Sequence, residues 1–250
     1  MTIDGWLWPV LLGGLGLVFG SFIATVAIRW PKGSSALQGR SHCDGCGNGL
    51  AARELVPVLS FVLQRGRCRS CGAPIHPGHL ATELLGMAIG AIAGLLVPGI
   101  GGIAGAVFGW LLLTLAALDL AAFWLPNALT GALAAAGLAA GLLDLWPPLD
   151  QRLIGGIGGY AALAAVAAGY RLLRGRQGLG GGDPKLFGAI GCWLGWQALP
   201  LVLLAAALIG IAAVLGFISA GRKVTATDRL PFGVMLATAA WAVWIGQVLA

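Results

Sequence analysis

The chain has 250 residues, of which 58% are hydrophobic and only 10% charged, and its mean hydropathy is +0.90. Soluble domains carry about 25% charged residues, so this composition excludes a soluble globular domain and predicts a polytopic membrane protein. The net charge of +6 does not point to nucleic acid, because the positions of the basic residues have a topological explanation given below. The 42 glycines predict close packing of membrane helices through small residues.

Apolar runs predict the helices, since a span needs about 20 apolar residues. In chain order the runs lie near residues 6–28, 81–98, 101–119, 128–146, 152–170, 184–198, 200–219 and 230–249. We therefore expect an all-α integral membrane protein of about eight transmembrane helices. The sixth run is short and only Pro200 separates it from the seventh, so seven spans is the alternative. The first run is expected to be retained rather than cleaved, because its positive charges, Arg29 and Lys32, follow it.

The basic residues predict the orientation. Three segments, 29–80, 171–185 and 220–229, hold 14 of the 15 lysines and arginines. The positive-inside rule places such segments in the cytoplasm, with the N-terminus periplasmic and Arg152 alone on the opposite side. We expect three parts: a first transmembrane helix (1–28), a polar cytoplasmic loop (29–80) and a membrane core (81–250).

Four cysteines in the polar loop form two Cys-x-x-Cys pairs, each followed by glycine. Two such knuckles can complete a tetrahedral Cys₄ site suited to Zn²⁺, and a cytoplasmic loop argues against disulfides. The sequence therefore predicts a structural zinc bound by Cys43, Cys46, Cys68 and Cys71. Four thiolates leave no open position, so we do not expect a catalytic metal. The nearby His42, His76 and His79 are expected to have surface roles, and Cys192 to be a packing residue.

Carboxylates at the edges of apolar runs are functional candidates. Asp144 lies beside Trp146 and is expected to be interfacial, whereas Glu83 opens the second helix, where a capping role is the simpler interpretation. Asp119 ends the third run and Asp183 begins the sixth. The predicted topology puts these two at one depth on the cytoplasmic side, where a pair of carboxylates can share a proton as acid and base.

A glycine run, Gly178-Leu179-Gly180-Gly181-Gly182, precedes Asp183. It is not a Walker loop, because Gly-Lys-Ser/Thr is missing; a purely structural turn remains the alternative to close approach of a substrate. From the residues alone, an aspartyl peptidase and a proton-coupled transporter both fit.

These motifs together resemble the type IV prepilin peptidases over nearly the whole chain. Gly20-Ser21-Phe22 with Arg29 and Pro31 is similar to the N-terminal signature of that family, and the segment from Cys43 to Glu83 is similar to its cysteine loop. Asp119 with Pro126 and Thr130 resembles the first aspartate motif. Gly180-Gly181-Gly182-Asp183-Pro184-Lys185 resembles Gly-x-Gly-Asp, and Pro231-Phe232-Gly233 also matches.

The resemblance implies an enzyme of the bacterial inner membrane. It would remove the leader of prepilins and pseudopilins after glycine at the cytoplasmic face, with Asp119 and Asp183 catalytic and Gly180, Gly182, Lys185 and Pro126 in support. Many members then methylate the new N-terminus with S-adenosylmethionine. Membrane lipid is a further expected partner and nucleic acid is not. A non-catalytic pilus or secretion assembly protein remains an alternative, as does the transporter.

The chain departs from the family pattern at three places. Ala24 stands where asparagine is usual, Gly78-His79-Leu80 where Arg-Tyr-Pro is frequent, and Asn127 where aspartate is common. None is an aspartate or cysteine of the motifs, so the departures bear on methyl transfer rather than on peptide cleavage. Lys185 is expected either to pair with a carboxylate or to mark the cytoplasmic boundary.

Overall fold

The computed structural model describes residues 4–36, 41–176, 178–223, 225 and 229–250; Arg40, one of the basic residues counted above, lies outside them. The described residues are helical, with two isolated β-bridges in the polar loop and no longer strand. The chain divides into two compact units, Met1–Ala117 and Leu118–Ala250, which are described separately.

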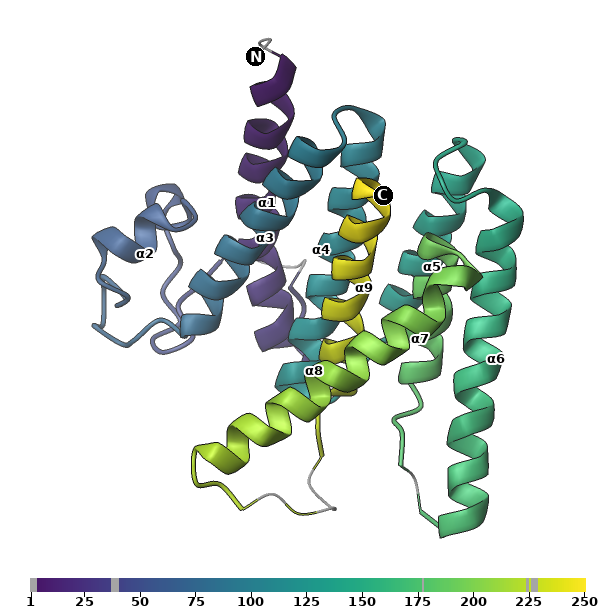
Figure 1. The fold of residues 1–250 in the computed structure, drawn as a ribbon. Helices are drawn as coiled ribbons and strands as arrows, with labels where there is room; N and C mark the ends of the chain where they lie inside the picture. The colour runs from purple at the N-terminus through teal and green to yellow at the C-terminus, as the bar shows by residue number, and fades with distance from the viewer. Residues whose placement is uncertain (1–3, 37–40, 177, 224, 226–228) are drawn as a thin grey trace. The chain divides into compact units, whose positions relative to one another are not determined.

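Among the described residues, six helices are long and apolar enough to cross a membrane. They are α1 (Asp4–Arg29), α3 (Pro77–Leu96), α4 (Ile100–Ala122), α6 (Leu149–Arg174), α8 (Leu199–Ser219) and α9 (Phe232–Leu249) (Figure 1). These match six of the eight predicted spans. The other two predicted spans are helices as well, but α5 (Asn127–Leu142) and α7 (Asp183–Leu194) have 16 and 12 residues, shorter than the usual span.

The first unit is built on contact between α1 and α3, which lie side by side (Figure 1). Glycines make this possible: a Cβ at Gly16 would collide with the carbonyl of Gly86, and one at Gly90 with that of Leu12. Trp110 of α4 donates its indole N–H to the Gly86 carbonyl at 2.9 Å. Small residues thus set the backbone approach, as the composition predicted. The polar loop between α1 and α3 carries the short helix α2 (Leu59–Leu63).

In the second unit α7 packs against α5, α6 and α9. Every residue of α7 except Lys185 is buried, and glycines again allow the approach, since a Cβ at Gly137 of α5 would lie 2.7 Å from the Cys192 carbonyl. Because other helices of the unit cover α7 along its length, its apolar sequence reflects contact with protein. Hydropathy alone predicted a run over 184–198, whereas the helix in the structure has 12 residues.

Candidate active site

Asp119 lies in the last turn of α4 and is 5% exposed. Its Oδ2 accepts a hydrogen bond from the backbone N–H of Val234 at 3.1 Å, in the first turn of α9. A helix N-terminus presents free N–H groups and a positive dipole end, so the first turn of α9 supplies a hydrogen-bond donor to this buried carboxylate. Gly233 is needed there, because a Cβ would lie 2.8 Å from Asp119 Oδ2. The Pro231-Phe232-Gly233 motif therefore forms the N-cap and the start of α9, where the first aspartate is received.

Asp183 is the first residue of α7 and is 6% exposed. Its Oδ2 accepts a hydrogen bond from the backbone N–H of Gly180 at 2.9 Å, which closes the glycine run into a turn. A Cβ at Gly180 would lie 3.1 Å from that oxygen, and one at Gly182 would lie 2.7 Å from the Leu125 Cβ, whereas a Cβ at Gly181 would meet nothing within 4 Å. The Gly-x-Gly-Asp spacing thus has a steric reason.

The two carboxylates belong to one site. The Cδ1 atom of Leu125 lies 3.1 Å from the Cβ position of Gly182 and 3.2 Å from that of Gly233, so one side chain touches the backbone beside both aspartates. Burial, and then the negative charge of Asp119, raise the pKa of Asp183, which lies outside the six spans, to about 6. Two neighbouring carboxylates with separated protonation can hold one proton between them near neutral pH.

The predicted supporting residues lie around this pair. Pro126 precedes α5 and its carbonyl accepts a hydrogen bond from the Thr130 hydroxyl at 3.3 Å. Lys185 is exposed and donates from Nζ to the Asn127 Oδ1 at 2.7 Å. Lys185 was expected either to pair with a carboxylate or to mark the cytoplasmic boundary. Its hydrogen-bond partner in the structure is a neutral amide and not a carboxylate. This bond joins the first turns of α5 and α7 beside Asp183.

Arg152 is a residue whose role the sequence did not reveal. It is only 2% exposed, and all five of its N–H groups donate to backbone carbonyls at 2.7–3.1 Å: Pro147, Gly137, Cys192, Leu145 and Trp146. These carbonyls belong to α5, to the turn after it and to α7. Arg152 therefore joins the C-terminal parts of α5 and α7, whereas Asn127 and Asp183 lie at the N-terminal ends of these helices. The available signal was that Arg152 stands alone among the lysines and arginines outside the three basic segments.

The cysteines of the polar loop converge as predicted. The Sγ atoms of Cys43, Cys46, Cys68 and Cys71 all lie within 4.8 Å of one another. The two halves share one backbone pattern: Gly47 N–H donates to the Cys43 carbonyl and Gly72 N–H to the Cys68 carbonyl, each at 2.9 Å, and both glycines have φ of 73°. Glycine after each pair is thus required by the left-handed turn.

The donor set fits a cation such as Zn²⁺. Backbone N–H groups of Cys71 and Ser70 lower the pKa of Cys68 to about 7. The Ala73 N–H also lowers the pKa of Cys71, but the crowded thiols of Cys46 and Cys68 outweigh it and raise that pKa to about 11. Four thiolates at this spacing therefore need a positive ion to coexist. Cys192 is buried in α7, consistent with the predicted packing role.

Glu83 caps a different helix from the one expected. It is the seventh residue of α3 rather than its opening residue, and its Oε2 accepts a hydrogen bond from the Val58 N–H at 2.7 Å, at the start of α2. The N-terminus of α3 is instead capped by His76, whose Nδ1 accepts from the Gly78 N–H at 3.1 Å. Asp144 is exposed in the turn after α5, which agrees with a peripheral role.

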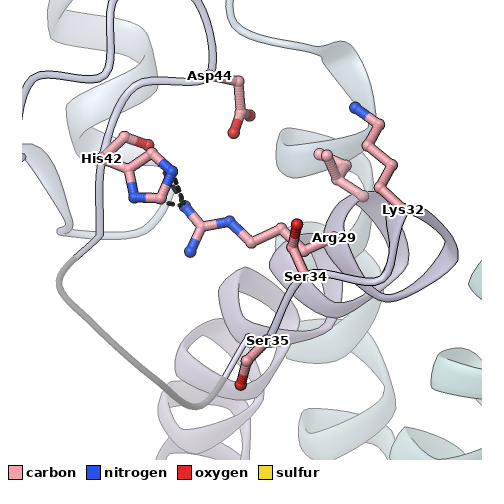
Figure 2. Close-up of a pocket in the computed structure, with 7 residues that line it drawn as sticks. Arg29, Lys32, Ser34, Ser35, His42 and Asp44 are labelled. Carbon is pink, nitrogen blue, oxygen red and sulfur yellow. Dashed lines mark hydrogen bonds between the residues drawn. The ribbon is translucent and has the colours of Figure 1, made fainter.

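A small cavity of about 160 Å³ lies between the end of α1 and the first cysteine knuckle. Figure 2 shows Arg29 reaching across it to His42, whose ring nitrogens lie 3.3 and 3.4 Å from Nη2. Lys32 and Asp44 complete a mixed-charge lining. His42 is thus engaged with the helix end, and the metal-binding group among the described residues consists of cysteines alone.

Two family models match the chain. Residues 15–96 match the bacterial peptidase A24 N-terminal domain and residues 106–215 match the type IV leader peptidase family. The first match contains the cysteine loop, and the second contains both buried aspartates.

Curated proteins match as well, and each is named a prepilin leader peptidase/N-methyltransferase. The protein of Klebsiella pneumoniae is 41% identical over 80% of this chain and 91% of its own length. That of Aeromonas hydrophila is 40% identical over 81% of this chain and 70% of its own length. That of Burkholderia pseudomallei strain K96243 is 39% identical, with shares of 89% and 80%. No solved structure matches the chain.

Proposed function

We infer the function of this protein from its family: the chain belongs to the type IV prepilin leader peptidase family, and it is a membrane protein and a protease. The transporter and the non-catalytic assembly protein are not favoured by this membership. What the family does not by itself assign is which atoms of this chain do the chemistry.

We propose that Asp119 and Asp183 are the catalytic pair. The observation that carries this is a pair of buried carboxylates, each held through Oδ2 by a backbone N–H from a glycine-containing turn, with Leu125 against the Cβ positions of both Gly182 and Gly233. With one proton shared, the ionised carboxylate removes a proton from water, and the hydroxide attacks the scissile carbonyl. The protonated partner donates its proton to the carbonyl oxygen. As the C–N bond breaks, the carboxyl that took the proton from water gives it to the leaving amine, and the partner takes back the hydroxyl proton as the carbonyl re-forms.

The substrate proposal follows the relatives' names. We propose that the substrates are prepilins or pseudopilins, cut after glycine at the cytoplasmic face of a bacterial inner membrane. The charge partition supports a periplasmic N-terminus and a cytoplasmic cysteine loop. In this proposal Gly180 and Gly182, Pro126 and Lys185 position the pair without touching the reacting atoms.

For the cysteine loop we propose structural zinc. Cys43, Cys46, Cys68 and Cys71 would hold it, and its chemistry there is to neutralise four thiolates and fold a loop too small for its own core.

Methyl transfer rests on the relatives' printed names. S-adenosylmethionine carries a cationic sulfonium, and the cavity of about 340 Å³ beside the cysteine cluster is lined by Arg67 and Arg69 with no carboxylate. That lining does not suit the cofactor, so no step is assigned to residues. Mass spectrometry of the mature N-terminus after cleavage with added S-adenosylmethionine decides whether a methyl group is transferred.

The peptidase proposal is tested by cleavage of a prepilin in detergent. Asp119→Asn and Asp183→Asn should each lose about 10²–10⁴-fold in rate, the usual contribution of a general acid or base, while retaining wild-type elution and metal content. Full cleavage by either variant would exclude the pair.

Matched glycine variants test the geometry. Gly182→Ala meets Leu125 and Gly233→Ala meets Asp119, whereas Gly181→Ala and Gly246→Ala meet nothing within 4 Å. The first two should lose activity and the last two should keep it. Equal cleavage rates for Gly182→Ala and Gly181→Ala, and for Gly233→Ala and Gly246→Ala, would contradict the described site.

A further inference from the structure

A cluster of large apolar side chains is exposed on α2 and the residues before it. Leu59, Val62 and Leu63 are 55%, 60% and 73% exposed, and Leu55 and Val56 are each 42% exposed. Single exposed apolar residues are ordinary, but five within nine residues form a patch that marks an interaction surface. We call residues 55–63 the apolar segment.

The apolar segment lies beside membrane-spanning helices rather than beyond their ends. Its Val58 N–H is bonded to Glu83, seven residues into α3, and the Glu83 Cα lies 2.6 Å from the Cβ position of Gly20. Gly20 is nine residues before the end of α1 at Arg29, which corresponds to about 14 Å along the helix at 1.5 Å per residue. Figure 1 shows α2 to the side of the lower part of α3. The exposed side chains are therefore held alongside α1 and α3, two helices long and apolar enough to cross a membrane.

The backbone is strained to achieve this placement. Val58 has φ 62° and ψ −52°, and the Leu59 N–H bonds to the Pro57 carbonyl at 2.6 Å, which together form a γ-turn of the rare, strained kind. A β-branched residue is a clear outlier at positive φ. Its persistence is explained by the Glu83 carboxylate, which accepts the Val58 N–H and fixes the direction in which α2 leaves the turn.

Arginines border the apolar segment. Arg53, Arg65, Arg67 and Arg69 are all exposed, and the single acidic residue of 51–69 is Glu54, whose carboxylate is engaged with the Ala51 N–H at 2.8 Å. The cavity of about 340 Å³ places Leu63 next to Arg67 and Arg69. An apolar side chain beside two guanidinium groups matches an acyl chain joined to a phosphate.

We propose that residues 53–69 are a membrane-surface anchor that binds anionic phospholipid, with the apolar segment among the acyl chains and Arg65, Arg67 and Arg69 on headgroup phosphates. The proposal depends on the chain being a membrane protein and not on the catalytic pair. A bilayer is favoured over a protein partner because the tether to Glu83 sets the segment at the flank of α1 and α3, where lipid is already present.

The test uses the full-length protein in vesicles of mixed phosphatidylcholine and phosphatidylglycerol carrying brominated acyl chains. A fluorescent noncanonical amino acid is placed at Leu63, at Val62, or at the exposed Asn48 of the first cysteine knuckle as control. Quenching should be several-fold greater at Leu63 and Val62 than at Asn48. Equal quenching at the three positions would overturn the proposal. The proposal would also be overturned if the probe at Leu63 were protected from an aqueous quencher only after a prepilin is added. That result would make the segment a substrate-docking surface.

A second arm tests the headgroup preference by brominating either lipid alone. At Leu63, brominated phosphatidylglycerol should quench more than brominated phosphatidylcholine. Arg65→Gln/Arg67→Gln/Arg69→Gln should weaken that preference by about fivefold or more, since one basic residue at an anionic surface changes affinity by about that factor. Arg171→Gln/Arg174→Gln, on α6, should leave it unchanged. An unchanged preference in the triple variant would show that the arginines do not contact the headgroups. Retained prepilin cleavage alongside failed quenching would reject the anchor and leave the peptidase intact.

Discussion

Arg152→Lys tests the packing beneath the candidate active site most directly. The guanidinium uses all five N–H groups on five carbonyls, whereas a lysine ammonium has three donors on one atom. At least two of these carbonyls would lose their hydrogen-bond partner. Water does not replace it readily, because the Arg152 side chain is only 2% exposed. Hydrogen bonds from a charged group are worth about 1.5–3 kcal/mol each, so the substitution should cost about 3–6 kcal/mol in the free energy of unfolding.

The assay is thermal unfolding in detergent, followed by intrinsic tryptophan fluorescence at one fixed scan rate. Arg152→Lys should lower the midpoint by about 10 °C, from about 2–4 °C per kcal/mol for a chain of this size. Arg152→Met should lower it further, because it removes every donor. The control is Arg171→Lys at an exposed position of the same helix, which should leave the midpoint unchanged. A midpoint for Arg152→Lys equal to that of the control would refute the inferred network.

The purified chain should bind about one zinc ion, as expected of a Cys₄ site; Cys46→Ser should abolish binding and Cys192→Ser should not, as metal analysis would show. Asp183→Asn should change the pH dependence of stability. Because the pKa of Asp183 is raised from 3.8 to about 6, the stability it contributes is present below about pH 4 and is lost as the pH rises through 6. The asparagine variant should therefore exceed wild type by at most about 3 kcal/mol at pH 7.5 and by nothing near pH 4; a difference independent of pH would contradict the raised pKa. Val58→Gly should leave the free energy of unfolding unchanged or raise it by up to about 2 kcal/mol. The reason is that backbone strain of about 1–3 kcal/mol is relieved, while glycine adds conformational entropy to the unfolded chain. A large decrease in the free energy of unfolding would show that the γ-turn is not strained.

Much of the candidate site could be predicted because its signals are local in sequence. A carboxylate that interrupts an apolar run, two Cys-x-x-Cys pairs and a glycine-rich turn before Asp183 each have a physical meaning that does not depend on the rest of the fold. The cysteine convergence is confirmed, and the two aspartates lie in one unit, both buried, each beside a glycine whose Cβ position meets Leu125. Their catalytic role stays a prediction.

What was wrong or missing concerned contacts between distant residues. Glu83 was expected to open its own helix, yet it caps α2, whose Val58 lies 25 residues earlier. The run at 184–198 was predicted as one of about eight helices, and α7 begins where expected, but the sequence did not reveal that it has only 12 residues and is covered by protein. Hydropathy cannot separate these cases, because an apolar residue has the same hydropathy whether lipid or another helix surrounds it.

The sequence by itself determined that the chain is a membrane protein with four converging cysteines in its polar loop, and which two aspartates to single out. These properties follow from composition and from short spacings. Only the tertiary structure decided that Asp119 is held by the N-terminus of α9, that Gly182 has no room for a Cβ beside Leu125, and that Arg152 is a buried tie. Each of these depends on a backbone N–H, a carbonyl or a side chain brought from elsewhere in the chain, and such partners are set by the packing of helices and not by neighbouring residues.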